Sequence, residues 1–202
     1  NTNGNIMGTL FVDKLDPQSG TSLEIGSNGD TITIPSGATI TNNGTQTGFG
    51  GVNTPAFEAW SNADQAVNDN TTTKVQCKAE VYDTAGAYDN SSTYRFTPQT
   101  AGKYFCYGQV FFESSSFAAS KINQATAYIY KNGAVVGASQ NNFKNNPIQQ
   151  FNSTVSTVID MNGSSDYIEL YGYFDGDSIN GVLVGQTTYR RTMFGAYKVI
   201  GA

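Results

Sequence analysis

The N-terminal part of the chain carries apolar residues in alternating pairs separated by turn-forming residues. The pairs are Leu10 with Val12, Leu23 with Ile25, Ile32 with Ile34, and Ala38 with Ile40. Residues 16–20, 27–30 and 35–37 stand between these pairs, and their Gly, Asn, Asp and Pro side chains favour turns. The pattern predicts short strands joined by turns over residues 9–45.

Strands of about three to five residues bury too little apolar surface to offset their ordering entropy if one chain stands alone. Three chains wound together would bury all the apolar stripes along one axis. We therefore predict an intertwined β-stalk, which ends in a glycine-rich hinge at residues 45–52. A flexible leader is the alternative. The predicted domains are residues 1–51, the stalk with its hinge, and residues 52–202, the head.

The head contains nine short runs that are rich in aromatic and β-branched residues, and it has no convincing helical pattern. These runs are 55–60, 74–81, 93–96, 103–112, 125–131, 135–138, 153–161, 167–174 and 191–200. The low charged fraction of 13% and the aromatic fraction of 12% also favour strands over helices. The sequence predicts an all-β protein whose head is a jelly-roll sandwich.

Two of the runs, 103–112 and 167–174, place apolar or aromatic residues at adjacent as well as alternate positions. Both faces of these strands then need to be covered, and packing between two sheets covers only one. Another copy of the same chain is the simplest cover. Seven aromatic residues are expected to make core or intersubunit contacts: Phe57, Phe105, Tyr107, Tyr171, Tyr173, Phe194 and Tyr197.

Six strings along the head resemble a known family. They are PAFEA at 55–59, YDNSSTYRFTP at 88–98, AGKYF at 101–105, YKNG at 130–133, DYIEL at 166–170 and FGAY at 194–197. Together they resemble the trimeric jelly roll shared by the globular heads of the first complement component and the tumour necrosis factor superfamily. The resemblance implies a homotrimer. Cys106 departs from the family, which usually has an aromatic residue at that position.

The leader resembles the shafts of bacteriophage tail or head fibres in its Asn-, Thr- and Gly-rich turns. It lacks the Gly-X-Y repeat of a collagen stalk, which argues against a complement-type architecture. The chain begins at Asn1 rather than Met and shows no secretion signal, so we expect a fragment or processed product of a longer protein.

Charge and composition exclude several partners and chemistries. The formal net charge is -5 and no dense Lys/Arg cluster occurs, so nucleic acid is not expected to bind. No stretch approaches the roughly 20 apolar residues of a membrane-spanning helix, so we expect no membrane insertion. The chain has no histidine, which removes Ser-His-Asp and Cys-His catalysis. We expect no enzymatic activity.

Cysteines and carboxylates leave some alternatives open. Cys77 and Cys106 are either buried free thiols or a disulfide, and metal binding by them is disfavoured because zinc sites usually need about four ligands. The Asp175 and Asp177 pair could belong to a calcium loop, but the following residues do not complete an EF-hand, and an ordinary turn is the favoured interpretation. No cofactor is expected.

Loop lengths predict which end of the head binds a target. Successive jelly-roll strands alternate in direction, so the short links 98–102, 132–134 and 162–166 should gather at the end facing the stalk. The first and last runs should pair near that end. The long links 61–88, 113–123, 140–152 and 175–190 should gather at the opposite end, where recognition usually resides. The receptor-contact candidates in these long links are Phe117, Phe143, Lys144, Tyr189 and Arg190.

These features predict a structural and adhesive fibre module of a virion, in particular a bacteriophage tail or head fibre. Its head would bind a host cell-surface glycan or protein, and its N-terminal side would contact other virion proteins. One alternative is a secreted, extracellular or surface recognition protein of bacterial or animal origin. The other is a glycan hydrolase that uses two carboxylates among Asp64, Asp69, Asp175 and Asp177.

Overall fold

The computed structural model describes residues 15–17, 19–44, 53–115 and 121–200. The chain divides into two units, Asn1–Thr47 and Gly48–Ala202. The predicted hinge at 45–52 and the pair Leu10 and Val12 lie outside the described residues.

The described part of the first unit consists of turns and extended segments. The Asp30 amide donates to the Ser27 carbonyl over 2.9 Å, and the Ala38 amide donates to the Pro35 carbonyl over 3.1 Å, which confirms two of the predicted turns. No strand forms in the described residues of this unit within a single chain. Its aliphatic side chains are exposed, namely Leu15, Leu23, Ile25, Ile32, Ile34 and Ile40.

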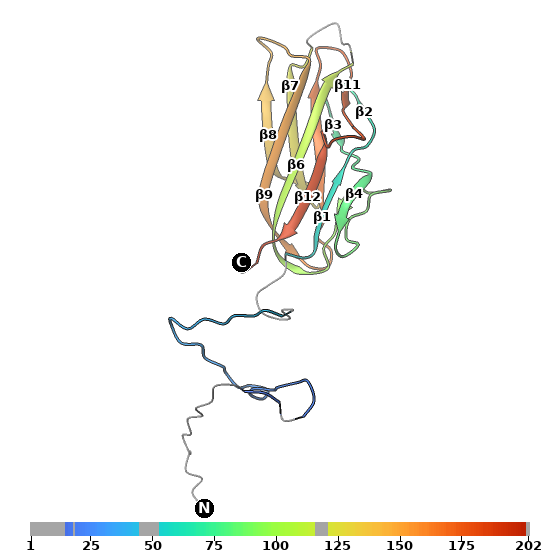
Figure 1. The fold of residues 1–202 in the computed structure, drawn as a ribbon. Helices are drawn as coiled ribbons and strands as arrows, with labels where there is room; N and C mark the ends of the chain where they lie inside the picture. The colour runs from blue at the N-terminus through green and yellow to red at the C-terminus, as the bar shows by residue number, and fades with distance from the viewer. Residues whose placement is uncertain (1–14, 18, 45–52, 116–120, 201–202) are drawn as a thin grey trace, which may run out of the picture. The chain divides into compact units, whose positions relative to one another are not determined.

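The second unit is a sandwich of two antiparallel sheets, shown in Figure 1. Its strands are β1 (Ala56–Trp60), β2 (Gln65–Val67), β3 (Thr71–Lys74), β4 (Ala79–Asp83), β5 (Arg95–Phe96), β6 (Ala101–Ser114), β7 (Gln124–Lys131), β8 (Ala134–Asn142), β9 (Gln150–Asn162), β10 (Ile168–Asp175), β11 (Gly181–Leu183) and β12 (Met193–Lys198). The larger sheet has the order β2-β11-β6-β12-β1-β4, with β9 also paired to β6. The smaller sheet has the order β3-β10-β7-β8, with β5 also paired to β10. The prediction of an all-β jelly roll is confirmed.

The predicted runs generally correspond to strands. Prediction and structure differ in one run, in one link and in two strands that were not predicted. The run 74–81 is not one strand: it begins at the last residue of β3, in the smaller sheet, and ends within β4, in the larger one. Val75 and Cys77, both buried, lie in the crossing between them. The link predicted at 140–152 is shorter, because β8 extends to Asn142 and β9 begins at Gln150. The strands β2 and β11 were not predicted, since three residues carry too little periodicity to be recognised.

Aromatic side chains from both sheets form the centre of the core. The Phe57 ring lies 4.5 Å from both the Tyr88 and Phe96 rings and 5.1 Å from the Phe194 ring, measured between centroids. Cys77 and Cys106 are free and buried in this core, and burial raises the pKa of the Cys106 thiol to about 12. The free-thiol alternative therefore describes this structure.

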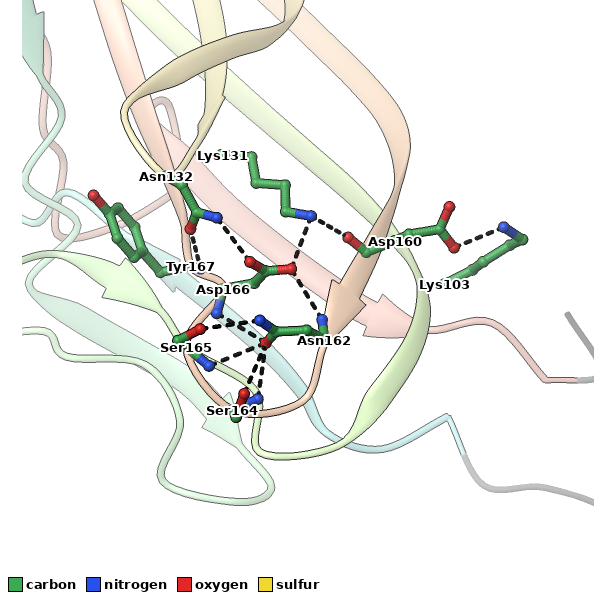
Figure 2. Close-up of polar contacts among 9 residues, drawn as sticks. All are labelled: Lys103, Lys131, Asn132, Asp160, Asn162, Ser164, Ser165, Asp166 and Tyr167. Atoms are coloured by element: carbon green, nitrogen blue, oxygen red, sulfur yellow. Dashed lines mark hydrogen bonds and ion pairs between the residues drawn. The ribbon is translucent and has the colours of Figure 1, made fainter.

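The three short links gather at one end of the sandwich, as predicted: Gln99 Nε2 donates to the Ser164 carbonyl, and Figure 2 shows how the links 132–134 and 162–166 are joined. Asn162 Oδ1 accepts the amides of Ser164, Ser165 and Asp166. The Asp166 carboxylate accepts from the Asn132 amide group over 2.7 Å and pairs with Lys131 over 2.8 Å. We call this end, residues 97–101, 132–133 and 162–167, the short-loop end.

The first and last strands of the head pair near the short-loop end, as predicted. Ala56 at the start of β1 is opposite Tyr197 in β12, and the Val199 amide donates to the Lys103 carbonyl near the start of β6. In Figure 1 this end is the lower end of the sandwich.

The long links meet at the opposite end, which we call the long-loop end: residues 68–70, 115, 121–123, 143–149 and 176–180. Asn123 connects two of them, because its amide donates to the Asp175 carbonyl and its carbonyl accepts from the Phe143 amide. Asn180 connects two more, through its carbonyl to the Ser115 amide and through its side chain to the Asp69 amide.

Two of the long links do not stay at that end. The predicted link 61–88 reaches it only near Asp69 and then returns, since β4 pairs with β1 down to Asp83 opposite Phe57. The link 175–190 also turns back, because the Val184 amide donates to Phe111 and the Gln186 amide to Ser61. Backbone hydrogen bonds to β6 and to the residue after β1 therefore draw this segment away from the tip.

Candidate functional site

The larger sheet presents an aromatic cluster on the face that points away from the core. Strand alternation turns Tyr104 and Cys106 of β6 inward, which leaves Phe105 and Tyr107 outward. The Phe105 ring lies 6.1 Å from the Tyr107 ring and 5.5 Å from the Tyr197 ring of β12. We call Phe105, Tyr107, Tyr197 and the neighbouring Val158 the larger-sheet face.

Val158 shows that the described chain leaves this face uncovered. It is the register partner of Phe105 on β9, and it is 55% exposed. The exposed valine adds apolar surface beside the outward aromatic rings, and exposed apolar patches mark interaction sites.

On the larger-sheet face, Tyr107 is connected through Glu58 to Arg190. The Tyr107 hydroxyl donates to Glu58 Oε2 over 2.7 Å, and Arg190 pairs with Glu58 Oε1 over 2.7 Å. Burial, followed by the Glu58 carboxylate, raises the pKa of Tyr107 well above its ordinary value, so the hydroxyl remains a donor. The Tyr107 ring lies over Gly195, where a Cβ would overlap it. Only glycine at 195 leaves room for this arrangement.

Arg190 also lines an open groove of about 400 Å³, together with Trp60, Thr187, Thr188 and Tyr189. The Arg190 guanidinium lies 5.3 Å from the centre of the Trp60 ring. Arg191 lies 4.7 Å from the Phe111 ring and donates to the Tyr189 hydroxyl over 2.7 Å. Aromatic rings, guanidinium groups and hydroxyls in one concave surface are the usual composition of a recognition site.

The smaller sheet has a different outward surface, made of Tyr128, Tyr130, Tyr167, Tyr171 and Tyr173, which we call the tyrosine face. Its centre is Glu169, which is 2% exposed and pairs with Lys74 over 2.6 Å and with Arg95 over 3.2 Å. The Arg95 guanidinium lies 4.0 Å from the centre of the Tyr167 ring.

The predicted contact candidates are not brought together. Phe117 lies outside the described residues. Phe143 is half-buried against the Phe151 ring, 4.8 Å away, and Lys144 is exposed beside it at the long-loop end. Tyr189 and Arg190 lie in the groove instead. Trp60, which completes the groove, was not among the predicted residues, although it is the chain's single tryptophan and directly precedes a polar link.

The seven predicted core or interface aromatics fall into three groups. Phe57 and Phe194 are fully buried in the core. Phe105, Tyr107 and Tyr197 belong to the larger-sheet face. Tyr171 and Tyr173 belong to the tyrosine face.

The four carboxylates considered for glycan hydrolysis each have a structural partner. Asp64 accepts the Gly185 amide and Asp69 accepts the Gly176 amide. Asp175 accepts from the Asn123 side chain, and Asp177 pairs with Lys121. Within the described residues, no three His, Cys, Asp or Glu side chains gather into a metal-binding group. The same residues include no helix long and apolar enough to cross a bilayer.

The strand order and the two-sheet core define a jelly roll, and its fold is similar to that of proteins of the tumour necrosis factor type. Comparison with solved structures supports this class. Murine APRIL superposes with a TM-score of 0.50 at 12% identity, covering 71% of this chain and 98% of that one. Eiger TNF from S. frugiperda superposes with a TM-score of 0.50 at 12% identity, covering 73% and 93%. No protein-family model matches the sequence, and no curated protein matches it either. The similarity establishes the fold.

Proposed function

We propose that the chain is the subunit of a homotrimeric attachment fibre, in which residues 1–51 form the stalk and hinge and residues 52–202 form the head. The observation that carries this proposal is that a single chain leaves apolar surface uncovered in both of its units. In the head this surface is the larger-sheet face, where Val158 is 55% exposed beside outward aromatic rings.

The leader supplies the second uncovered surface. Its exposed aliphatic residues alternate with polar ones, as in Leu23 with Ile25 and Ile32 with Ile34. One extended chain cannot bury such a stripe, but three parallel copies can turn their stripes toward one axis. Trimerisation of the head and of the leader would then reinforce each other, because joining one raises the effective concentration of the other.

The target is a receptor protein or a glycan on a host cell surface, contacted by the long-loop end and the groove. Phe143 and Lys144 are presented at that end, and Tyr189 and Arg190 line the groove. The turn-rich leader resembles bacteriophage shafts, so we place the fibre on a virion, with its N-terminal side on other virion proteins. Three heads on one fibre would bind a surface with several target sites more tightly than one head, because their weak contacts act together.

Two measurements on the full chain test this proposal. Native mass spectrometry in dilute solution should give three times the 21.6 kDa subunit mass. Fluorescently labelled protein should bind saturably to intact cells of a host panel. A stable single subunit would reject the fibre architecture, and a trimer without saturable binding would reject the attachment role.

A secreted or surface recognition protein is the second candidate, and its support is the fold shared with murine APRIL and Eiger TNF. Such a protein would form the same homotrimer but would not be part of a virion. Immunogold labelling of purified particles distinguishes the two candidates, because only the fibre is retained on them.

A further inference from the structure

The tyrosine face has more aromatic surface than the fold of the smaller sheet requires. In β10 the residues Ile168, Leu170 and Phe174 fill the core, so Tyr171 and Tyr173 are free to point outward. In β7 the same alternation turns Ile129 inward. A solvent-facing sheet surface ordinarily carries polar residues. Partly buried tyrosines in their place indicate a surface that contacts something else.

The rings form a connected platform across two strands. Tyr128 is the register partner of Tyr171, and the Tyr130 and Tyr171 rings lie 4.3 Å apart at 40°. The Tyr128 and Tyr130 rings lie 6.1 Å apart and are nearly perpendicular. Tyrosine offers a large contact area at little cost in conformational entropy, since only two side-chain torsions need to be fixed.

The hydroxyls of the platform stay protonated at neutral pH, and those of Tyr171 and Tyr173 donate to Glu169 and Asn70, so they meet a ligand as acceptors. Burial, followed by the Glu169 carboxylate, raises the pKa of Tyr171 to about 12, and burial also raises the pKa of Tyr130 and Tyr173. The neighbouring edge strand, β8, contains no charged residue; on this face it adds the amide side chains of Gln140 and Asn142 and an exposed valine, Val135, opposite Tyr130. A ligand on this face therefore meets aromatic rings, hydroxyls and amides.

The charges around the platform are matched within the chain. Glu169 is paired with Lys74 and Arg95, and Lys131 at the end of β7 is paired with Asp166. Asp175 at the end of β10 is buried and accepts from an amide side chain. These three cations and three carboxylates sum to no net charge, so the platform does not select a ligand of either sign.

We infer that the tyrosine face is a binding surface for an uncharged polysaccharide. The C–H faces of a sugar ring pack on aromatic rings, and its rim of hydroxyls bonds to tyrosine hydroxyls and amides. A second copy of this chain fits less well, because stable self-assembly favours a more apolar surface such as the larger-sheet face. The inference extends the proposed attachment function by naming a target class, but it requires neither the trimer nor the long loops.

The test titrates the full chain with soluble neutral glucans, mannans and galactans, and in parallel with polygalacturonate and heparin, by calorimetry. The double variant Y128A/Y130A should lower affinity for the neutral ligand about tenfold or more. The variant Y128F/Y130F, which keeps the rings, should retain most of the affinity. Tyr82→Ala is the matched control: Tyr82 is a 41% exposed tyrosine on β4 of the other sheet, and the change should alter affinity less than twofold.

The single tryptophan locates the ligand independently. Trp60 lies in the groove on the other sheet, so binding at the tyrosine face should leave its fluorescence unchanged. The inference is overturned by binding that alters Trp60 emission, by binding only to the charged polymers, by no glycan binding at all, or by an unaltered affinity of Y128A/Y130A. A change of oligomeric mass in Y128A/Y130A would assign the face to self-association instead. A monomer that still binds neutral glycan through this face would reject the proposed fibre and keep this inference.

Discussion

The two outward faces of the sandwich are both aromatic, yet their surroundings differ. Phe105 on the larger-sheet face has Val158 as its register partner, so its neighbour is apolar and exposed. Tyr130 on the tyrosine face also has an exposed valine opposite it, Val135, but Tyr171 lies beside a carboxylate held between Lys74 and Arg95. Aromatic content alone therefore does not identify a partner. The groups around the rings decide whether a dry protein surface or a hydroxyl-rich ligand fits.

The largest expected effect comes from a charge placed on the larger-sheet face. Tyr107→Asp removes the hydrogen bond to Glu58 and places a second carboxylate beside it. We expect the native mass to fall to that of the single subunit, because an unpaired buried charge is not tolerated at an apolar interface.

The matched variant for that experiment is Tyr128→Asp on the tyrosine face, which should keep the parental mass. Native mass spectrometry measures both, and thermal unfolding confirms that both variants are folded. Equal loss of assembly in the two variants would remove the distinction between the faces.

A substitution in the shared core should affect both faces at once. Phe57→Ala removes the ring that contacts Tyr88, Phe96 and Phe194, and should lower the free energy of unfolding by about 3–5 kcal/mol. Urea unfolding followed by Trp60 fluorescence and by tyrosine circular dichroism should show one coincident transition. Val81→Ala, at an exposed position, should cost less than about 0.5 kcal/mol. Separate transitions would mean that the two sheets unfold independently.

Removing the central carboxylate of the tyrosine face should have a smaller effect. Glu169→Gln leaves Lys74 and Arg95 without their shared anion, and because both cations are about one-third exposed we expect a loss of about 1–3 kcal/mol. Asp160→Asn breaks the exposed pair with Lys103 and should cost less than about 0.5 kcal/mol. Chemical denaturation measures both. Equal costs would show that burial of Glu169 adds nothing.

The smallest effect is expected for the stability in acid that comes from Asp89. Its loop contacts Lys74, which belongs to the ion cluster around Glu169. The Ser92 hydroxyl, followed by that of Thr93, donates to Asp89 and holds its pKa well below the ordinary value. The Thr93 carbonyl in turn accepts from Lys74. Because the folded pKa is lowered, this stabilisation is full above the ordinary pKa of about 3.9 and is lost as pH falls further.

Thermal unfolding measured from pH 7 to pH 2 tests this dependence. The variant Asp89→Asn should be less stable at pH 7 and should lose less stability on acidification than the parent. A parent and variant with the same pH slope would exclude Asp89 as a source of the dependence.

The strands could be predicted where they are long. The patterns of 103–112 and 153–161 identified β6 and β9, and apolar residues at adjacent positions of 103–112 indicated that β6 has two apolar faces. The three-residue strands β2 and β11 escaped prediction because their pairing depends on neighbours far along the chain.

The site was less predictable than the fold. Loop length placed Phe143 and Lys144 at the long-loop end, but it placed Tyr189 and Arg190 there too. Backbone hydrogen bonds from Val184 and Gln186 to the larger sheet draw that segment back, and no local pattern announces them. Sequence also could not separate Phe57, in the core, from Tyr171, on an outward face, because both are aromatic residues in alternating runs.

The position of β1 has a mechanical consequence. This strand lies between β12 and β4, antiparallel to both, and it starts near the short-loop end. A pulling force that enters at Ala56 and is resisted at the opposite tip runs along the strand. Cross-strand hydrogen bonds lie perpendicular to that direction, so they are sheared together rather than opened one after another. Tension applied in this way would load the pairing of β1 with β12 and β4 in shear.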